Sequence, residues 1–416
     1  MRRFLLSVIV AAWSGGAGPA AAQGDDLMTR EIDDALAASR WRAGPFRLTP
    51  ILRIGAGTDS NPLGQPGTET TDDVTAAVGP GIRAVLPMGN RGLIELNQEN
   101  GYVYFRDLEN LRNFYNISDM SAAIGGRDFV AKARGGYRTG QVRPTSELDV
   151  PLEQTQRRYG GEVDIALGST QQLNVIYDSV RFRHHDPEAD IGVPVESLLD
   201  RTEESYRAQF ERYISPTASL IVEGTYNVID YVDSSTLRNG TGIGGMAGIV
   251  FSPRGRVRGQ AMFGYDQLTP EFDSQAAFSG LVASADVIYP LGDKLRLRGL
   301  YARDTRPSIL PGNWFFVENR FGGSLDVYLA DRWFVRAGAT VGRNSYPRPT
   351  TFTDEEGNTV TAKVQDDFNI YTFSVNYELT LDLIVRGGID IQQRSSNLPQ
   401  FNKDRNVVTI GLTTLF

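Results

Sequence analysis

The sequence predicts an all-β fold, a transmembrane antiparallel up-and-down β-barrel of about 18 strands with both termini on the periplasmic side of a bacterial outer membrane. Three observations carry this prediction. The chain begins like a secreted precursor, it alternates short turns with long polar loops from residue 46 onward, and it ends on a strand whose last residue is aromatic. Sixteen strands is the alternative count, because the segments 48–58 and 114–125 have the weakest strand patterns.

The first 22 residues have the pattern of a secretory signal peptide. Arg2 and Arg3 precede an apolar run from Phe4 to Trp13, and small residues follow as far as Ala22. A basic start, a short apolar stretch and a small-residue cleavage site identify a signal peptide rather than a membrane helix. We therefore expect cleavage after Ala22 and export to the cell outer membrane of a Gram-negative bacterium.

The composition excludes several classes of protein. The chain has no Cys, so neither disulfides nor thiolate metal sites contribute to its fold. Its formal net charge of -8 argues against nucleic acid as a partner. No downstream apolar run reaches the roughly 18 residues that a membrane helix needs. The modest 41% of hydrophobic residues is compatible with a barrel, in which only alternate residues meet lipid.

Residues 23–45 differ from everything after them. Met28, Ile32, Ala35 and Leu36 would share one side of a helix. We expect a short periplasmic segment with helical character here, separate from the barrel of residues 46–416. A plug of the barrel is the alternative, although so short a segment offers little material for one.

From residue 46 onward the chain alternates strands and connections. Short turns lie between alternate strand pairs, and the connections between them are longer and polar, which is the pattern of periplasmic turns and extracellular loops in outer-membrane barrels. In the loop at 346–366, residues 350–353 and 359–363 are expected to prolong the flanking strands as a hairpin. The predicted strands lie near 48–58, 72–86, 93–105, 114–125, 129–139, 158–168, 171–183, 202–214, 218–231, 240–252, 255–267, 277–289, 294–304, 314–329, 332–345, 367–379, 381–393 and 405–416.

Charged residues repeat every second position along several of these strands, opposite an apolar face. A charge on the lipid face costs roughly 2–4 kcal/mol at mid-bilayer, so we expect these side chains to face a water-filled lumen. A soluble β-sandwich, whose outer faces would be equally polar, is the alternative. The predicted lumen-facing residues are Arg256, Arg258, Asp286, Arg296, Arg298, Glu318, Asp326, Arg336, Glu378 and Arg386.

The last strand resembles the C-terminal recognition signature of outer-membrane barrel proteins. The positions that carry this resemblance are Thr409, Gly411, Thr414 and Phe416, with Thr414 standing where an apolar residue is usual. The resemblance implies that these residues act as a barrel-insertion signal, with the barrel-assembly machinery and outer-membrane lipid as partners.

No catalytic, cofactor or metal site is predicted. His184 and His185 are the only histidines, and they precede Asp186 in an expected polar loop. The run from Gly242 to Ala247 matches a dinucleotide fingerprint, but no βαβ unit surrounds it. The acidic run 354–358 lacks the spacing of a calcium loop. The sequence therefore predicts that the protein is not an enzyme.

The segment from Leu52 to Pro62, Leu-Arg-Ile-Gly-Ala-Gly-Thr-Asp-Ser-Asn-Pro, resembles the opening strand of a β-barrel porin family of proteobacterial outer membranes. Genes of that family often accompany exopolysaccharide genes. The resemblance implies a channel for exopolysaccharide export or a porin-like pore, with polysaccharide and periplasmic export proteins as partners. A general diffusion porin for small hydrophilic solutes and a non-conducting structural or binding barrel remain the alternatives.

Overall fold

The computed structural model describes residues 27–37, 39–67, 70–185, 195–233, 237–252, 255–310, 312–353, 359–380, 382–398 and 401–416. The predicted signal peptide, Asp186, the turn at 253–254 and the acidic run 354–358 lie outside these ranges. Among the described residues, no helix is long and apolar enough to cross a membrane.

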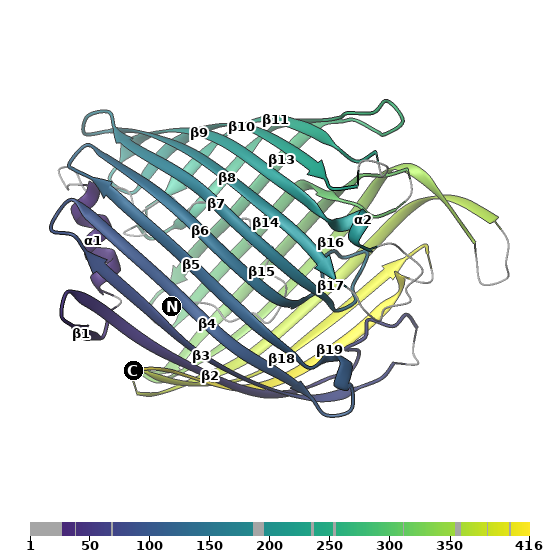
Figure 1. Cartoon of the computed structure of the whole chain (residues 1–416), viewed down its shortest axis with the longest axis horizontal. Coiled ribbons are helices and arrows are strands. Elements are labelled where there is room, and N and C mark those ends of the chain that lie inside the picture. The colour runs from purple at the N-terminus through teal and green to yellow at the C-terminus, as the bar shows by residue number, and fades with distance from the viewer. Residues whose placement is uncertain are drawn as a thin grey trace.

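Strands β2 to β19 form a closed antiparallel barrel (Figure 1). The first half of the barrel comprises β2 (Phe46–Asp59), β3 (Asp73–Pro87), β4 (Gly92–Phe105), β5 (Asn113–Gly125), β6 (Phe129–Val142), β7 (Leu152–Ala166), β8 (Gln171–His185), β9 (Arg201–Ser215) and β10 (Ala218–Tyr231). The second half comprises β11 (Gly240–Phe251), β12 (Arg258–Pro270), β13 (Phe278–Leu291), β14 (Leu295–Pro307), β15 (Phe315–Ala330), β16 (Trp333–Thr353), β17 (Thr359–Thr380), β18 (Leu383–Ser396) and β19 (Lys403–Leu415).

The ring closes because the last strand pairs with the first. β19 runs antiparallel to β2, from Val407 opposite Asp59 to Leu415 opposite Ile51, and the backbone N–H of Phe416 donates to the carbonyl of Pro50 at 3.0 Å. Every barrel strand therefore has two neighbours and no edge is left open, which a membrane barrel requires. The prediction of 18 strands is confirmed, and the alternative count of sixteen is wrong.

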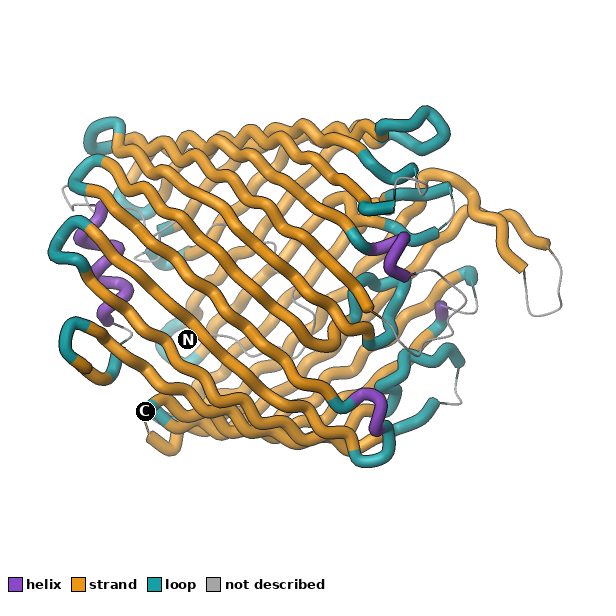
Figure 2. The backbone as a smooth tube through the Cα atoms, viewed as in Figure 1, coloured by secondary structure: helices purple, strands orange, loops and turns teal. Residues whose placement is uncertain are grey.

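The two ends of the barrel differ, as Figure 2 shows. At one end, here called the turn end, tight connections such as 126–128 and 216–217 join the strands. At the other, the loop end, the connections include 60–72, 143–151 and 186–200, with a 3₁₀ helix Glu109–Leu111 and the short helix α2 (Val195–Leu199). β16 and β17 continue past the rim as a projecting hairpin that pairs Thr353 with Thr359 (Figure 1), which confirms the predicted prolongation.

Several strand boundaries differ from the sequence expectation, and two of the differences lie at the loop end of β7 and β8. β7 begins at Leu152 rather than near 158, and β8 continues through both histidines. Outside the barrel, a short strand β1 (Trp41–Ala43) folds back on the start of β2 at the turn end. Backbone pairing thus continues at the loop end beyond the segments with an apolar alternation.

Most barrel strands have an apolar face and a polar face. On the apolar face, large side chains such as Phe263, Leu297 and Phe373 are exposed. On the polar face, Arg298, Asp326 and their neighbours form ion pairs. This two-residue alternation follows from the pleat of a strand, which turns successive side chains to opposite faces of the sheet.

Helix α1 (Leu27–Ala37) packs on the polar face of β3–β6 at the turn end. The backbone N–H groups of Leu27 and Met28 donate to the carbonyls of Arg127 and Gly126 at 3.2 and 3.3 Å, and Glu31 pairs with Lys132 at 2.7 Å. The apolar side of the helix is therefore buried against the barrel wall. The residues in this contact are Leu27, Met28, Ile32 and Ala35 of the helix and Val85, Leu93, Ala123 and Val130 of the wall.

Candidate functional site: a charged wall and a loop across the mouth

An ionic row crosses strands β14 to β16 on the polar face. The strand register places Asp326 between Arg296 and Arg336. Arg336 donates to both carboxylate oxygens of Asp326, at 2.5 and 2.7 Å, and Nε of Arg296 lies 4.0 Å away. Beside this row, Nε of Arg298 donates to Asp286 at 2.5 Å. Four of the predicted charged residues thus form two ion pairs between adjacent strands, Arg336 with Asp326 and Arg298 with Asp286. Arg296 adds a longer contact to Asp326.

The other predicted charged residues are more scattered. Glu318 lies 3.7 Å from Arg320 and 4.0 Å from Arg306. Glu378 and Arg386 share the polar face near the turn ends of β17 and β18. Nε of Arg258 donates to the carbonyl of Gly255 at 3.4 Å. All the predicted charged residues except Arg256 lie in strands.

Arg256 lies in the connection before β12, not in a strand, because β12 begins at Arg258 rather than at residue 255. Its guanidinium lies 5.0 Å from the ring centre of Tyr289. Stacking of this kind is a favourable cation–π contact for an arginine at a partly exposed site. Arg256 is therefore separated from the ionic row of β14–β16.

A second ionic cluster, which sequence reasoning missed, lies on the polar face of β6–β9. Asp178 is buried among Arg134, Arg158 and Arg207, whose nearest nitrogens lie 2.9, 3.5 and 3.3 Å from its carboxylate oxygens. The cross-strand partner of Asp178 is Gly160, which has no side chain. A Cβ at position 160 would lie only 2.8 Å from Oδ1 of Asp178, so the glycine leaves room for the carboxylate. Charged residues at every second position of these strands, such as Lys132 and Arg134, are the sequence signal from which this cluster could have been predicted.

The loop between β6 and β7, residues 143–151, crosses the barrel at its loop end, and we call it the strap. Ser146 accepts a hydrogen bond from Asn344 of β16 at 3.1 Å, and its carbonyl accepts one from Arg394 of β18. Around the ring, eight strands separate β7 from β16 one way and seven separate β6 from β16 the other way. The strap therefore joins nearly opposite sides of the wall.

The far end of the strap is held by a buried carboxylate. Glu147 is 2% exposed, and it accepts hydrogen bonds from the Ser308 hydroxyl at 2.7 Å and from the Ile309 backbone N–H at 2.6 Å. Arg238 in turn donates to the carbonyls of Ser308 and Ile309. These contacts fix the strap to the loop that follows β14.

The near end of the strap is held by Arg143. Its guanidinium donates to the carbonyl and the carboxylate of Asp149 at 2.6 and 2.8 Å, and to the carbonyl of Pro62 at 2.6 Å. Leu148 adds an apolar contact with Leu152, Val195 and Leu199. Together these bonds bind the strap to the loop after β2 and to α2.

The anchor at Glu147 predicts a pH dependence. Burial raises the pKa of this carboxyl above its ordinary value of 4.5, although the hydrogen bonds from Ser308 and Ile309 oppose the shift. The anchored strap then binds the proton more tightly than a free strap does. Anchoring is therefore strongest below the ordinary pKa and weakens as the pH rises through the raised pKa.

For this reason we expect the conductance of the barrel to increase as the pH rises through the raised pKa of Glu147. The substitution Glu147→Gln keeps the size of the side chain and removes the titration, so this variant is expected to lose the pH dependence. Single-channel recordings across this pH range test the expectation. An equal pH response in both proteins would show that another group is responsible.

His184 lies on β8 and not in a loop, contrary to the sequence expectation. Its Nδ1 lies 3.1 Å from the Asp200 carboxylate and its Nε2 lies 2.7 Å from the Gln154 side-chain nitrogen. Its neighbour His185 contacts Glu196 at 3.3 Å. His184 is thus a buried hydrogen-bonding residue that ties β8 to the start of β9.

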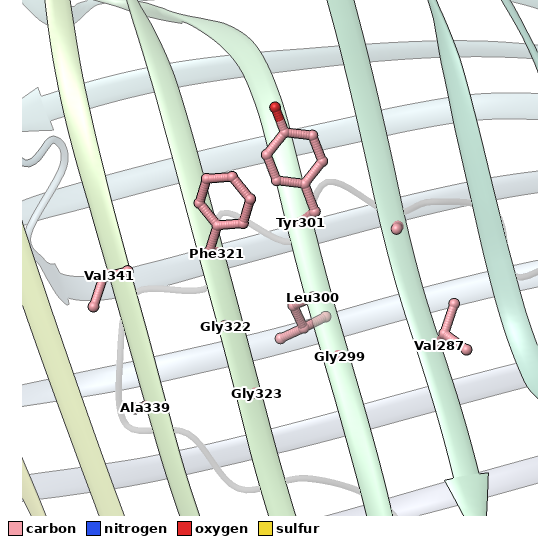
Figure 3. Close-up of a pocket in the computed structure, with 10 residues that line it drawn as sticks. Val287, Gly299, Leu300, Tyr301, Phe321, Gly322, Gly323, Ala339 and Val341 are labelled. Atoms are coloured by element: carbon pink, nitrogen blue, oxygen red, sulfur yellow. The ribbon is translucent and has the colours of Figure 1, made fainter.

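A pocket of about 480 Å³ lies on the apolar face of β13–β16 (Figure 3). Its floor includes Gly299 and Gly323, which have no side chains, and the rings of Tyr301 and Phe321 stand at its edge. These two rings are 4.5 Å apart between centroids. The pocket is a depression in the apolar outer surface and is separate from the charged face.

Comparison with known proteins places the chain among barrels. Residues 126–416 match the family described as putative beta-barrel porin 2. The structure is similar to the FrpB iron transporter from Neisseria meningitidis (F5-1 variant, apoprotein form), with 10% identity, a TM-score of 0.50, and coverage of 90% of this chain and 66% of that chain. No curated protein matches the sequence.

Two structures from Pseudomonas aeruginosa, OpdQ and the outer membrane protein opdK, also match along most of the chain. OpdQ shares 10% identity and opdK shares 11%, with TM-scores of 0.49 and 0.48. Each comparison covers 89% of this chain and 98% of the other.

The family match begins just after β5 and ends at the last residue, so it covers well over half of the chain. It starts beyond the Leu52–Pro62 segment, on which the sequence resemblance rested. The predicted resemblance to a β-barrel porin family is nevertheless confirmed by this longer match. The chain belongs to the putative beta-barrel porin 2 family.

Proposed function

We propose that this protein is an outer-membrane pore for small hydrophilic solutes. The observation that carries the proposal is the closed barrel of 18 strands with an apolar outer face and an ion-paired polar face. Barrels of about this strand number leave an aqueous channel. In this proposal the polar face lines the channel and the apolar face meets lipid.

The orientation follows from the same pattern. Outer-membrane barrels place their short turns in the periplasm and their long loops outside the cell. The turn end, with α1 and both barrel termini, is therefore periplasmic, and the strap lies at the outer mouth. Cleavage of the signal peptide after Ala22 and recognition of Thr409, Gly411, Thr414 and Phe416 by the assembly machinery belong to this proposal.

The charged wall suits hydrophilic solutes. Arg296, Arg298 and Arg336 each contact a carboxylate, so the wall presents fixed charges of both signs without a single strong binding centre. Guanidinium groups can also donate to solute hydroxyls and carboxylates. A polar solute can therefore exchange its hydrogen bonds with water for weak hydrogen bonds with the wall, and diffuse through the channel without being trapped.

The strap favours small solutes over a polymer. While Ser146 and Glu147 are held by the opposite wall, a chain crosses the outer mouth. Passage of exopolysaccharide, with periplasmic export proteins as partners, is the second candidate, because the same paired charges would let a hydroxyl-rich polymer slide. That function requires the strap to leave the mouth during export.

Liposome swelling with sugars of increasing size tests the proposal. Uptake of mono- and disaccharides, with exclusion of long oligosaccharides, is the expected result. Absence of both swelling and ion conductance would favour a structural barrel. Loss of surface polysaccharide on deletion of the gene, with unchanged uptake of small solutes, would instead support the polymer route.

Ion selectivity tests the assignment of the wall. In the variant Arg296→Gln, Arg298→Gln and Arg336→Gln, the carboxylates Asp286 and Asp326 keep their charge and lose their cationic partners. We expect a severalfold shift of permeability toward cations, measured as the reversal potential in planar bilayers under a salt gradient.

The matched control is Arg343→Gln, because Arg343 pairs with Asp367 at 2.6 Å on the apolar face of β16. This substitution also leaves a carboxylate without its partner, but outside the proposed channel. The control is expected to keep the wild-type reversal potential. Equal shifts in both variants would remove the three arginines from the channel wall.

A further inference from the structure

Three arginines stand on the apolar face of β7 and β8, near the loop end. Arg157 shares its face with the exposed Tyr159 and Val163, whereas the neighbouring Arg158 contacts Asp178 on the polar face. Arg181 and Arg183 occupy the corresponding face of β8, which carries the exposed Val175. The three guanidinium groups are therefore directed away from the barrel interior.

The height of these arginines matches a membrane boundary. β8 begins at Gln171 and Arg181 is ten positions further on, while a membrane-spanning strand needs about 9–11 residues. On the membrane side of the arginines, Tyr159, Tyr177, Tyr206 and Tyr226 form a continuous row, with ring centroids 6.3, 4.9 and 6.1 Å apart. Tyrosines gather at the boundary between lipid tails and headgroups.

The positive charges of these three arginines are only partly balanced by acids within the described part of the chain. Arg157 and Arg181 are direct cross-strand partners, and like charges at such positions repel each other. Among the described residues, neither of the two has an ion pair, and Arg183 lies 3.6 Å from Asp200. Glu204, which pairs with Ser179 two residues below Arg181, accepts hydrogen bonds from Tyr177 and Tyr206 at 3.2 Å each.

Two other arginines on the apolar face near the loop end, Arg343 and Arg303, have partners. Arg343 forms two hydrogen bonds with the Asp367 carboxylate, at 2.6 and 3.0 Å. Arg303 donates to the Asn319 side chain at 2.7 Å and to the carbonyl of Leu281 at 2.9 Å. The repulsive pair on β7 and β8 therefore differs from these two arginines and is suited to an anion from outside the chain.

We propose that Arg157, Arg181 and Arg183 bind the phosphate groups of lipid A, the phosphorylated glycolipid of the outer leaflet. The inference rests on the proposed orientation, which places the loop end in that leaflet. Guanidinium groups bind phosphate oxygens in a bidentate manner, and a bound phosphate removes the repulsion between Arg157 and Arg181. The acyl chains would then lie along the tyrosine row and the apolar face beneath it.

Binding of lipid A to the purified barrel in detergent tests the proposal, measured by native mass spectrometry. The probes are bisphosphorylated lipid A and its dephosphorylated form. The variant carries Arg157→Gln, Arg181→Gln and Arg183→Gln, and Arg343→Gln is the matched control on the opposite wall. We expect the triple variant to bind the phosphorylated lipid about tenfold more weakly or worse, as loss of charged hydrogen bonds implies, and the control to bind like the wild type.

Two results would overturn the proposal: equal binding of phosphorylated lipid A by the triple variant and the wild type, or equal binding of both lipid forms by the wild type. The folded state is checked by the heat-dependent shift in gel mobility. Should the triple variant fail this check, Arg157→Gln with Arg181→Gln takes its place under the same expectations. Binding is measured without transport. A barrel that binds lipid A but conducts no ions would therefore refute the proposed pore function and leave the lipid-binding proposal intact.

Discussion

Replacing residues 144–150 with a short Gly/Ser linker is expected to raise the single-channel conductance severalfold. They make up most of the strap across the loop end of the barrel, and their removal breaks the anchors of Ser146 and Glu147 on the opposite wall. The barrel itself should persist, because Val142 and Leu152 face each other at the ends of β6 and β7 and a short connection can join them. Recordings in planar bilayers measure the change.

The matched control shortens the hairpin of β16 and β17 beyond the rim, by removing residues 350–362. This hairpin projects away from the barrel (Figure 1), and its removal should leave the conductance unchanged. A strap variant that conducts like the wild type, while it retains its heat-modifiable mobility, would show that the strap does not limit the pore.

The strands could be predicted from the sequence because the alternation that marks each strand lies within a few consecutive residues. Alternation of apolar and polar residues needs only the pleat of one strand and contact with lipid on one side. The error at β7 has the same cause. Glu153, Thr155 and Arg157 continue the outer face beyond the tyrosine row, where lipid tails no longer select apolar side chains. Backbone pairing with β6 continues there without an apolar pattern.

The strap could not be predicted, because its contacts join residues far apart in the sequence. Glu147 meets Ser308, and Ser146 meets Asn344, only after the barrel has closed. No local spacing distinguishes residues 143–151 from the other polar loops. The Asp178 cluster is intermediate, since the charges are visible in the sequence but their pairing depends on the register of four strands.

The substitution Asp178→Ala is expected to lower the free energy of unfolding by about 3 kcal/mol, the lower end of the cost of removing one partner of a buried ion pair. The side chains of Arg134, Arg158 and Arg207 are 11%, 18% and 15% exposed, so water compensates little for the lost carboxylate. Arg134 retains Glu162 at 3.2 Å. The repulsion among the three guanidinium groups then adds to the cost of closing β6–β9.

Asp286→Ala is the matched control, because Asp286 also pairs with an arginine on the polar face but its side chain is 42% exposed. An exposed pair contributes about 0–1 kcal/mol, so this variant should unfold close to the wild type. Urea unfolding of both variants in detergent micelles, followed by tryptophan fluorescence, measures the difference. If Asp178→Ala unfolds at the same urea concentration as Asp286→Ala, water in the barrel screens the cluster and the arginines do not depend on one carboxylate. The expected result instead makes Asp178 the residue that allows three arginines to share one stretch of wall.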